Sequence, residues 1–144
     1  VVMAFGAEDF TRDVGSKRTR ESLLFARSQL VAAARSAGVQ ASDTVFSDVD
    51  DRDALLEETR HVRDLGFDGK GAINPRQIAA IHDGFAPPAA EIEHARRVVA
   101  AAEEAEQQGI GAIAIGGKMI DRPVLDRARR TLDLAQRMSI GRGL

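Results

Sequence analysis

Acidic and amide residues follow three apolar segments of the chain, and these are the residues best placed to do chemistry. Glu8 and Asp9 follow the apolar run 1–5, an acidic cluster follows 44–46, and Asn74-Pro75 follows 69–73. In open α/β sheets and (β/α)8 barrels, ligands bind at the carboxyl ends of the strands. A carboxylate there suits Mg²⁺, which takes one or two protein carboxylates together with substrate and water. The pattern favours an enzyme with a metal ligand at Glu8 or Asp9, and loop capping is the alternative interpretation.

The second acidic cluster has a local explanation. Asp48, Asp50 and Asp51 stand immediately before a predicted helix. Side chains at that place cap free backbone N–H groups and compensate the helix dipole. We therefore interpret them as capping residues, and expect any metal site to be completed from elsewhere.

Basic residues gather at the start of the first long helix. Lys17, Arg18 and Arg20 oppose the helix dipole there, which is unfavourable unless a phosphate or carboxylate lies nearby. Lys17 and Arg18 are therefore candidates for substrate binding, with a solvated loop as the alternative. Lys70 and Arg76 are weaker candidates for the same role.

Three further features of the sequence have structural interpretations that involve no catalysis or binding. The glycines of 109–118 do not have the spacing of a phosphate-binding loop, and we predict a tight extended passage. Asp121 precedes Arg122-Pro123 and predicts an N-cap for the last helix. The histidines fall among charged neighbours on predicted helices and are assigned to solvated faces: His61, His82 and His94.

The elements that must position these residues alternate between strand and helix. Apolar runs at 1–5, 44–46 and 69–73 predict strands, and helical periodicity follows each of them. This order is typical of βα units that build a parallel sheet. The pair Pro87-Pro88 ends the pattern, and a long helix over 91–108 and a last helix from 122 follow.

Composition excludes several classes of protein. The chain has 144 residues, no cysteine, and a formal net charge of −2 at pH 7, so it has neither a disulfide framework nor a basic field for nucleic acid. Only 4 % of its residues are aromatic, too few for a base-stacking surface. No apolar run approaches the roughly 20 residues of a membrane span. We expect a cytoplasmic protein that contacts neither nucleic acid nor membrane.

Several short motifs occur together in an order that is similar to one known family. They are Gly6-Ala7-Glu8-Asp9-Phe10, Lys17-Arg18-Thr19, Ala26-Arg27-Ser28-Gln29, Asp43-Thr44-Val45, Phe67-Asp68-Gly69-Lys70, Ile73-Asn74-Pro75-Arg76-Gln77-Ile78 and Gly117-Lys118-Met119-Ile120-Asp121. The chain resembles the carboxy-terminal half of the citrate lyase β-subunit group, within the HpcH/HpaI aldolase and malyl-CoA lyase superfamily.

The resemblance implies a fold and an assembly. Residues 1–86 would be the last three βα units of a (β/α)8 TIM barrel, and residues 87–144 a helical extension that acts as a lid on a neighbouring subunit of a homotrimer or hexamer. A closed barrel has eight such units and about 250 residues. We therefore expect the chain to be part of a longer folded polypeptide.

The resemblance also implies a reaction and roles for named residues. The reaction is Mg²⁺-dependent cleavage or formation of a carbon–carbon bond in a citryl-, malyl- or citramalyl-type thioester of coenzyme A or an acyl carrier protein. Asp9 would ligate Mg²⁺, together with a glutamate upstream of this chain, and Asp121 would be the catalytic acid–base group. Residues assigned to the substrate or its carrier are Glu8, Lys17, Arg18, Lys70, Ile73, Asn74 and Pro75. The alternatives are a free-acid aldolase of the HpaI type and a non-catalytic subunit that keeps the fold.

Overall fold

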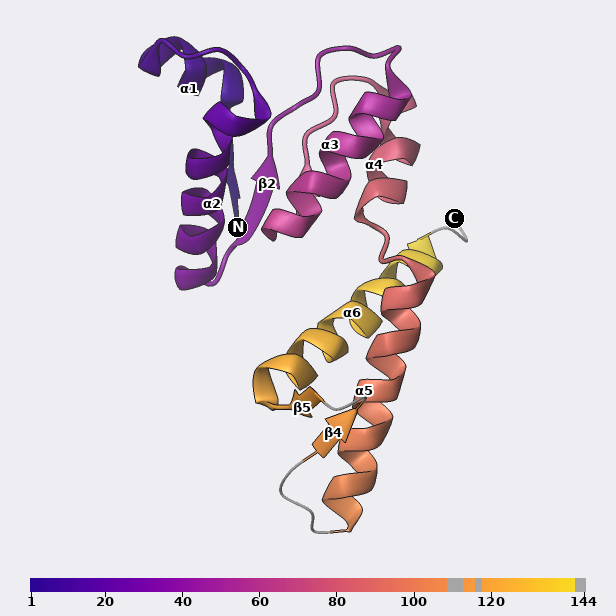
Figure 1. The fold of residues 1–144 in the computed structure, drawn as a ribbon. Helices are drawn as coiled ribbons and strands as arrows, with labels where there is room; N and C mark the ends of the chain where they lie inside the picture. Colours follow the sequence, from indigo (N-terminus) through magenta and orange to yellow (C-terminus); the bar gives the residue numbers. More distant parts are fainter. Residues whose placement is uncertain (109–112, 116–117, 142–144) are drawn as a thin grey trace. The chain divides into compact units, whose positions relative to one another are not determined.

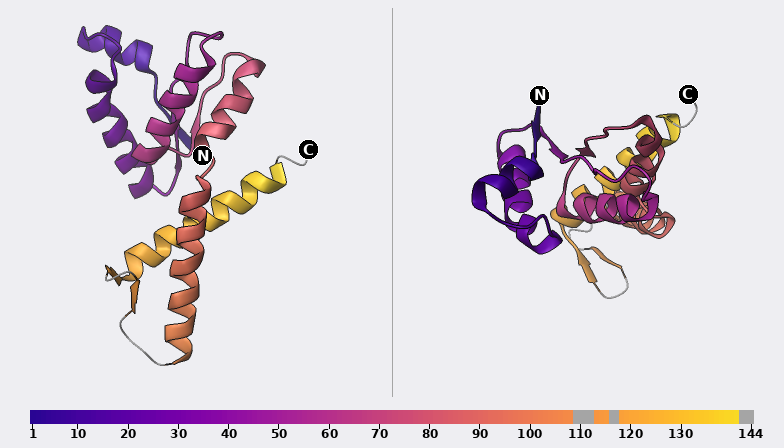
Figure 2. Two further views of the ribbon diagram at one scale, coloured as in Figure 1. Left: turned by 45° about the vertical axis from the view of Figure 1, so that its right-hand side comes forward. Right: turned by 90° about the horizontal axis from the view of Figure 1, so that it is seen from above.

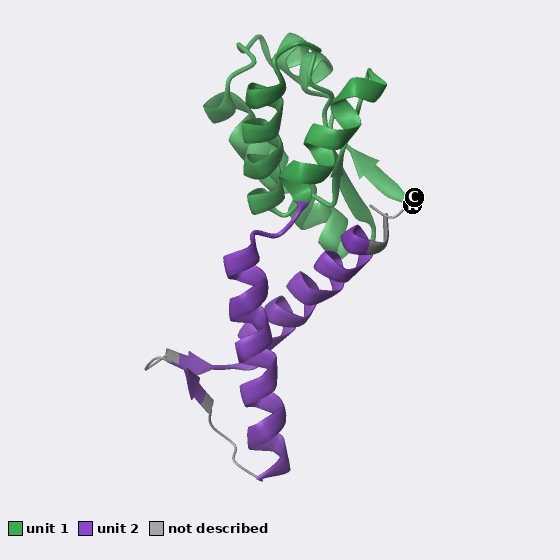
Figure 3. Ribbon diagram, turned by 90° about the vertical axis from the view of Figure 1, so that its right-hand side faces the viewer, with its two compact units in different colours: residues 1–85 green, residues 86–144 purple. Residues whose placement is uncertain are grey.

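The computed structural model describes residues 1–108, 113–115 and 118–141. Within it the chain forms two compact units, Val1–Phe85 and Ala86–Leu144 (Figure 3). Each unit has its own elements and its own core, so the two are described separately. No helix in the described part of the chain is long and apolar enough to cross a membrane.

Unit 1 is a three-stranded parallel sheet with helices between the strands (Figure 1). The strand order is β1-β2-β3, and Ser42 of β2 pairs with Ala4 on one side and with Gly69 on the other. The α/β class and the parallel pairing predicted from the sequence are confirmed. The elements are β1 (Val2–Ala4), α1 (Ala7–Val14), α2 (Arg20–Ser36), β2 (Gln40–Asp43), α3 (Arg52–Leu65), β3 (Gly69–Lys70), the 3-10 helix η1 (Pro75–Gln77) and α4 (Ile78–Phe85).

The two faces of β2 have different surroundings. Ala41 and Asp43 are buried, whereas Gln40 is exposed and Ser42 is partly exposed. Successive side chains of a strand point to opposite faces. Asp43 bonds to Arg27 of α2, so the buried face of the strand is the one that the helices cover.

Apolar spacing and capping explain the helices of unit 1. Leu23, Val31 and Ala34 form the buried stripe of α2, and Thr19 begins this helix with a capping box shared with Ser22. Helix α3 begins where the Asp51 carboxylate accepts the N–H of Ala54, and it ends at Gly66, whose φ of 101° is left-handed.

The sequence-based prediction was wrong at three places in unit 1. The third strand, predicted over 69–73, ends at Lys70, because only Gly69 and Lys70 pair with β2. The second strand is Gln40–Asp43 rather than 44–46, because the ladder to β1 and β3 ends there and the chain then leaves the sheet. The strand was missed because its alternation of polar and small side chains lacks an apolar run. Glu8 and Asp9 lie in the first turn of α1 rather than in a loop.

In its described residues, unit 2 contains two long helices and a small hairpin (Figure 2). Helices α5 (Ala89–Gln107) and α6 (Arg122–Gly141) pack together around Ala95, Val98 and Ala128. Strands β4 (Ile113–Ile115) and β5 (Lys118–Ile120) pair antiparallel. The predicted extended passage over 109–118 therefore contains β4 and only the first residue of β5. Its glycines at 109, 111, 116 and 117 lie outside the described residues.

Candidate functional site

The first turn of α1 places two carboxylates just after the carboxyl end of β1. The Asp9 side chain is 75 % exposed, and its Oδ1 lies 3.0 Å from Nη1 of Arg12. An exposed pair of this kind contributes at most about 1 kcal/mol, so a cation can replace Arg12 as the partner of this carboxylate. The ring of Phe10 in α1 lies 5.7 Å from that of Phe5, which directly follows β1, so this contact joins the helix to the end of the strand.

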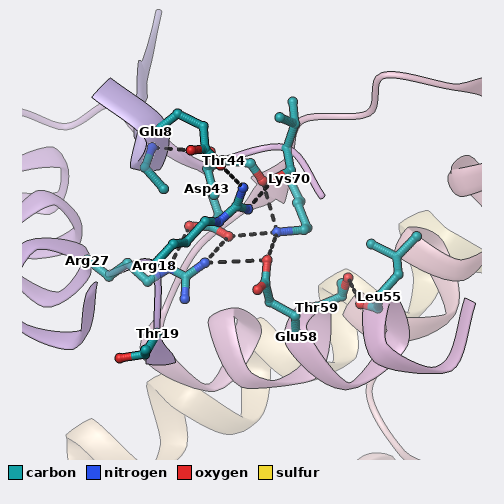
Figure 4. Close-up of polar contacts among 12 residues, drawn as sticks. Glu8, Arg18, Thr19, Arg27, Asp43, Thr44, Leu55, Glu58, Thr59 and Lys70 are labelled. Carbon is teal, nitrogen blue, oxygen red and sulfur yellow. Dashed lines mark hydrogen bonds and ion pairs between the residues drawn. The ribbon is translucent and has the colours of Figure 1, made fainter. Parts of the chain in front are cut away.

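Glu8 and Arg18, two of the predicted substrate-binding residues, contact each other (Figure 4). The Arg18 guanidinium donates through Nη1 to the Glu8 carboxylate and through Nη2 to the carbonyl of Val45, at 2.6 Å. The backbone N–H of Ala7 donates to Oγ1 of Thr44 at 3.2 Å. Helix α1 is thus tied to the segment after β2 by two independent contacts.

A buried ion network lies where β2 and β3 end (Figure 4). Arg27 donates through Nε and Nη2 to both oxygens of Asp43, at 2.8 and 2.9 Å. Lys70 Nζ donates to Asp43 at 2.8 Å, to the Thr44 carbonyl at 2.9 Å and to Glu58 at 2.6 Å. The side chains of Arg27, Asp43 and Lys70 are at most 1 % exposed. Two cations and two anions compensate each other in this network, as buried charges require.

This network changes the interpretation of Lys70. The sequence placed Lys70 among the carrier-binding candidates, but all three ammonium hydrogens have acceptors inside unit 1. Arg27, Asp43 and Glu58 were not predicted as functional residues. One signal was available, since Arg27 lies within the apolar stripe of Leu23, Val31 and Ala34, where an arginine requires a buried partner.

The segment after β3 has the predicted local structure. Asn74 Oδ1 accepts the N–H of Arg76 at 3.0 Å, and Pro75 is the first residue of η1. Ile73 is 55 % exposed. The buried Gln77 accepts the N–H of Ile73 and donates to the Phe46 carbonyl at 2.8 Å, so this segment is also bonded to the one that follows β2.

Residues 44–46 therefore connect the three strand ends. Thr44 Oγ1 accepts a hydrogen bond from the N–H of Ala7. The carbonyl of Val45 accepts one from the Arg18 guanidinium, and the carbonyl of Phe46 accepts one from the Gln77 amide. Of the acidic residues that follow, Asp51 caps α3 as predicted. Asp48 Oδ1 instead accepts the N–H groups of Asp50 and Asp51 in the turn before the helix, and Asp50 Oδ1 accepts from Arg76 Nη1 at 3.1 Å. Lys17, another basic candidate, is exposed.

Helices α2 and α3 border a cavity of about 210 Å³ that His61 lines. Arg20 Nη2 lies 2.8 Å from His61 Nδ1, so Nδ1 accepts and the proton of the neutral ring is on Nε2, which is buried without a partner in the described structure. Burial, and then the charges of Arg20 and Arg27, lower the pKa of His61. The assignment of His61 to a solvated face was therefore wrong.

Asp121 lies in unit 2, directly after β5. Its Oδ1 accepts the N–H of Val124 and its carbonyl accepts the N–H of Leu125, each at 3.1 Å. The predicted N-cap is confirmed. The side chain is exposed at the start of α6, and one oxygen is sufficient for capping.

The carboxylates of Asp9 and Asp121 do not form a complete metal site with other described residues. Within the described residues, no group of three or more histidine, aspartate or glutamate side chains is arranged to hold a metal ion. Asp9 can supply one hard oxygen ligand, which is a usual contribution of a protein to Mg²⁺.

The sequence profile of the HpcH/HpaI aldolase/citrate lyase family matches residues 1–75. The chain belongs to this family. It is 51 % identical over 136 residues to citrate lyase subunit beta of Escherichia coli strain K12, an alignment that covers 93 % of this chain and 45 % of that protein. It is 39 % identical over 135 residues to the human mitochondrial citramalyl-CoA lyase, with 92 % of this chain and 40 % of that protein covered.

A solved structure gives the same relationship. Protein CitE of Mycobacterium tuberculosis, in complex with magnesium, acetoacetate and coenzyme A, matches 93 % of this chain and 51 % of its own, with a TM-score of 0.79 and 33 % identity. The chain spans about half the length of these relatives. The family membership predicted from the motifs is confirmed.

Proposed function

We propose that the polypeptide containing this chain is a Mg²⁺-dependent carbon–carbon lyase. Its substrate is a citryl-, malyl- or citramalyl-type thioester of coenzyme A or an acyl carrier protein, and its products are an acyl thioester and an α-keto acid. The observation that carries the proposal is the exposed Asp9 carboxylate just after the carboxyl end of β1. Support comes from relatives named citrate lyase subunit beta and citramalyl-CoA lyase, and from a related structure that holds magnesium and coenzyme A.

The proposal includes the place of this chain in the whole protein. Residues 1–86 are the last three βα units of a (β/α)8 barrel, and residues 87–144 are the extension that covers a neighbouring subunit of a cytoplasmic homotrimer or hexamer. The parallel order β1-β2-β3, with a helix after each strand, supports the first assignment.

Asp9 fits Mg²⁺ as a single ligand. When bound, the metal supplies Lewis-acid stabilisation of the substrate oxygens on which negative charge develops. The contribution of this chain is to hold one carboxylate at the strand end, with the remaining ligands supplied by substrate, water and a glutamate outside the chain. Residues 73–75 and Lys17 lie at or near strand ends, where the carrier arm would enter.

Asp121 is proposed to move a proton. In the cleavage direction, the substrate hydroxyl gives its proton to solvent water and becomes the carbonyl of the α-keto acid, while the carbon–carbon electron pair passes to the α-carbon of the thioester. Asp121 then delivers a proton to that carbon, and in condensation it removes one. Its role as N-cap occupies Oδ1 and is compatible with proton transfer at Oδ2.

Two substitutions in the full-length protein test these roles. Asp9→Asn removes the charged ligand and should weaken Mg²⁺ binding, measured by calorimetry, by about 100-fold or more, above the 10–100-fold typical of outer partners. Asp121→Asn keeps an N-cap residue, so the protein should fold and bind Mg²⁺ normally while kcat falls about 10²–10⁴-fold. Asp133→Asn, at an exposed carboxylate of α6, is the control and should change neither quantity.

Either of two results would overturn the proposal. One is unchanged Mg²⁺ affinity in Asp9→Asn. The other is a folded, metal-loaded wild-type protein that releases no pyruvate, glyoxylate or oxaloacetate from a panel of thioesters.

A further inference from the structure

We infer that Arg18, together with Thr44, is a positioning residue that fixes the first turn of α1, and with it Asp9, on the segment after β2. The inference rests on the proposed role of Asp9 as a metal ligand. It gives Arg18 and Glu8 a different function from the substrate binding expected from the sequence.

The geometry of Arg18 is that of a clamp between two segments. Its side chain is 20 % exposed, and its guanidinium donates to Glu8 in α1 and to the Val45 carbonyl 27 residues further along the chain. A planar guanidinium has five N–H donors in a fixed geometry, so one side chain can hold both acceptors at once. Glu8 is therefore engaged by an internal cation and adds little negative charge to the site.

Thr44 provides the second contact. The first N–H groups of a helix have no partner within the helix, and the residue before α1, Gly6, has no side chain to cap them. Thr44 Oγ1 accepts the N–H of Ala7 and performs this function from another segment. Ala7 is completely buried, which fixes this end of the helix.

These contacts hold the two residues immediately before Asp9. The Asp9 side chain makes an exposed ion pair with Arg12, which orders a carboxylate only weakly. Its location is consequently set by the backbone of residues 7 and 8. A carboxylate that must meet a cation held partly by other ligands requires such support, because a loosely placed ligand lowers metal affinity.

Arg18→Gln in the full-length protein tests the inference. We expect Mg²⁺ affinity, measured by calorimetry, to fall about tenfold, as is typical when a partner outside the ligand set is removed. In the metal-free protein, amide hydrogen exchange at Phe10 and Thr11 should be about tenfold faster, because the first turn opens more often. Arg18→Lys keeps the charge but cannot reproduce both contacts, so it should recover only part of either loss.

Arg63 offers a matched control. Its side chain is 17 % exposed, and the contacts of its guanidinium include the Asp64 carboxylate and the Gly84 carbonyl. Arg63→Gln removes a similarly buried arginine away from α1. It should leave Mg²⁺ affinity and exchange at Phe10 and Thr11 unchanged.

A double-mutant cycle with Glu8→Gln separates positioning from direct ligation. If Glu8 acts through Arg18, Glu8→Gln and Arg18→Gln both remove the same Glu8–Arg18 contact. The double variant should then bind Mg²⁺ as weakly as Arg18→Gln alone. Additive losses would show that Glu8 ligates the metal itself and would overturn the inference.

The outcomes distinguish this inference from the proposed function. If Asp9→Asn weakens Mg²⁺ binding but Arg18→Gln, or Arg18→Lys should the first variant not fold, behaves like the Arg63→Gln control, the positioning role is wrong and the proposed function stands. If Asp9→Asn binds Mg²⁺ normally, the proposed metal site itself is wrong.

Discussion

The two units of the chain build their cores from different chemistry. The buried polar and charged residues of the described chain all belong to unit 1, and they include Arg27, Asp43 and Lys70. The buried residues of unit 2, within its described part, are alanines and Val98. Directional bonds fix where the strand ends of unit 1 lie, whereas small side chains let α5 and α6 approach closely. The unit with the candidate metal ligand is thus the one whose core specifies position.

The largest expected effect is the loss of the shared carboxylate of unit 1. Asp43→Ala leaves Arg27 and Lys70 with Glu58 as the one remaining anion of the network, and breaking a buried ion network in this way typically costs about 3–5 kcal/mol. Urea unfolding of the full-length protein measures this change. Asp133→Ala removes an exposed carboxylate paired with Arg137 in unit 2, and should cost less than about 1 kcal/mol. Equal losses in both variants would contradict the proposed difference between the cores.

A smaller effect is expected in the apolar core of unit 2. Val98 is completely buried, so Val98→Ala should reduce the free energy of unfolding by about 1.5–3 kcal/mol through lost apolar contact. Val14 is 56 % exposed, and Val14→Ala is the matched control, with an expected change within about 0.5 kcal/mol. A negligible cost at Val98 would mean that unit 2 is loosely packed.

The smallest expected effect is a pH dependence of the free energy of unfolding, which arises from His61 in unit 1. The pKa of His61 is lowered by burial and by Arg20 and Arg27, so the unfolded chain binds a proton at a higher pH than the folded chain. The contribution of neutral His61 to the stability of the folded chain is complete above the unfolded pKa of about 6.5, and it is lost as the pH falls below that value. Unfolding free energies measured between pH 8 and 5 should therefore decrease toward acid. His61→Gln should remove part of this slope, and an unchanged slope would contradict it.

Features fixed by neighbouring residues were predictable from the sequence. Asn74 and Asp121 cap helices as expected, and α5 covers nearly the predicted range, because each depends on a few adjacent residues. The second strand was misplaced because β2 is defined by its pairing with β1 and β3 rather than by its own composition. The partners of Lys70 also come from distant parts of the chain, and sequence spacing alone cannot supply them. The positions of Glu8 and Asp9 just after a strand were predicted, but the clamp that holds them was not.

A pKa shift illustrates the same dependence on distant residues. Burial alone would raise the pKa of Asp68, but hydrogen bonds from Arg35 and from the N–H of Ala41 outweigh it and hold the pKa below its usual range. Arg35 lies 33 residues earlier in the chain, and it also donates to the carbonyl of Gly66. Ordinary values assigned from the sequence would miss this stabilised carboxylate.

The connecting segment 44–46 has a consequence for how the protein can vary. Its bonds to Arg18 and Gln77 use the carbonyl oxygens of Val45 and Phe46, and every amino acid supplies such an oxygen. Thr44 differs, because its side-chain hydroxyl accepts the N–H of Ala7. In a library randomised over these three positions, we expect diverse residues at 45 and 46 and a strong preference for hydroxyl-bearing residues at 44. The segment can thus accumulate sequence changes while it continues to join the three strand ends.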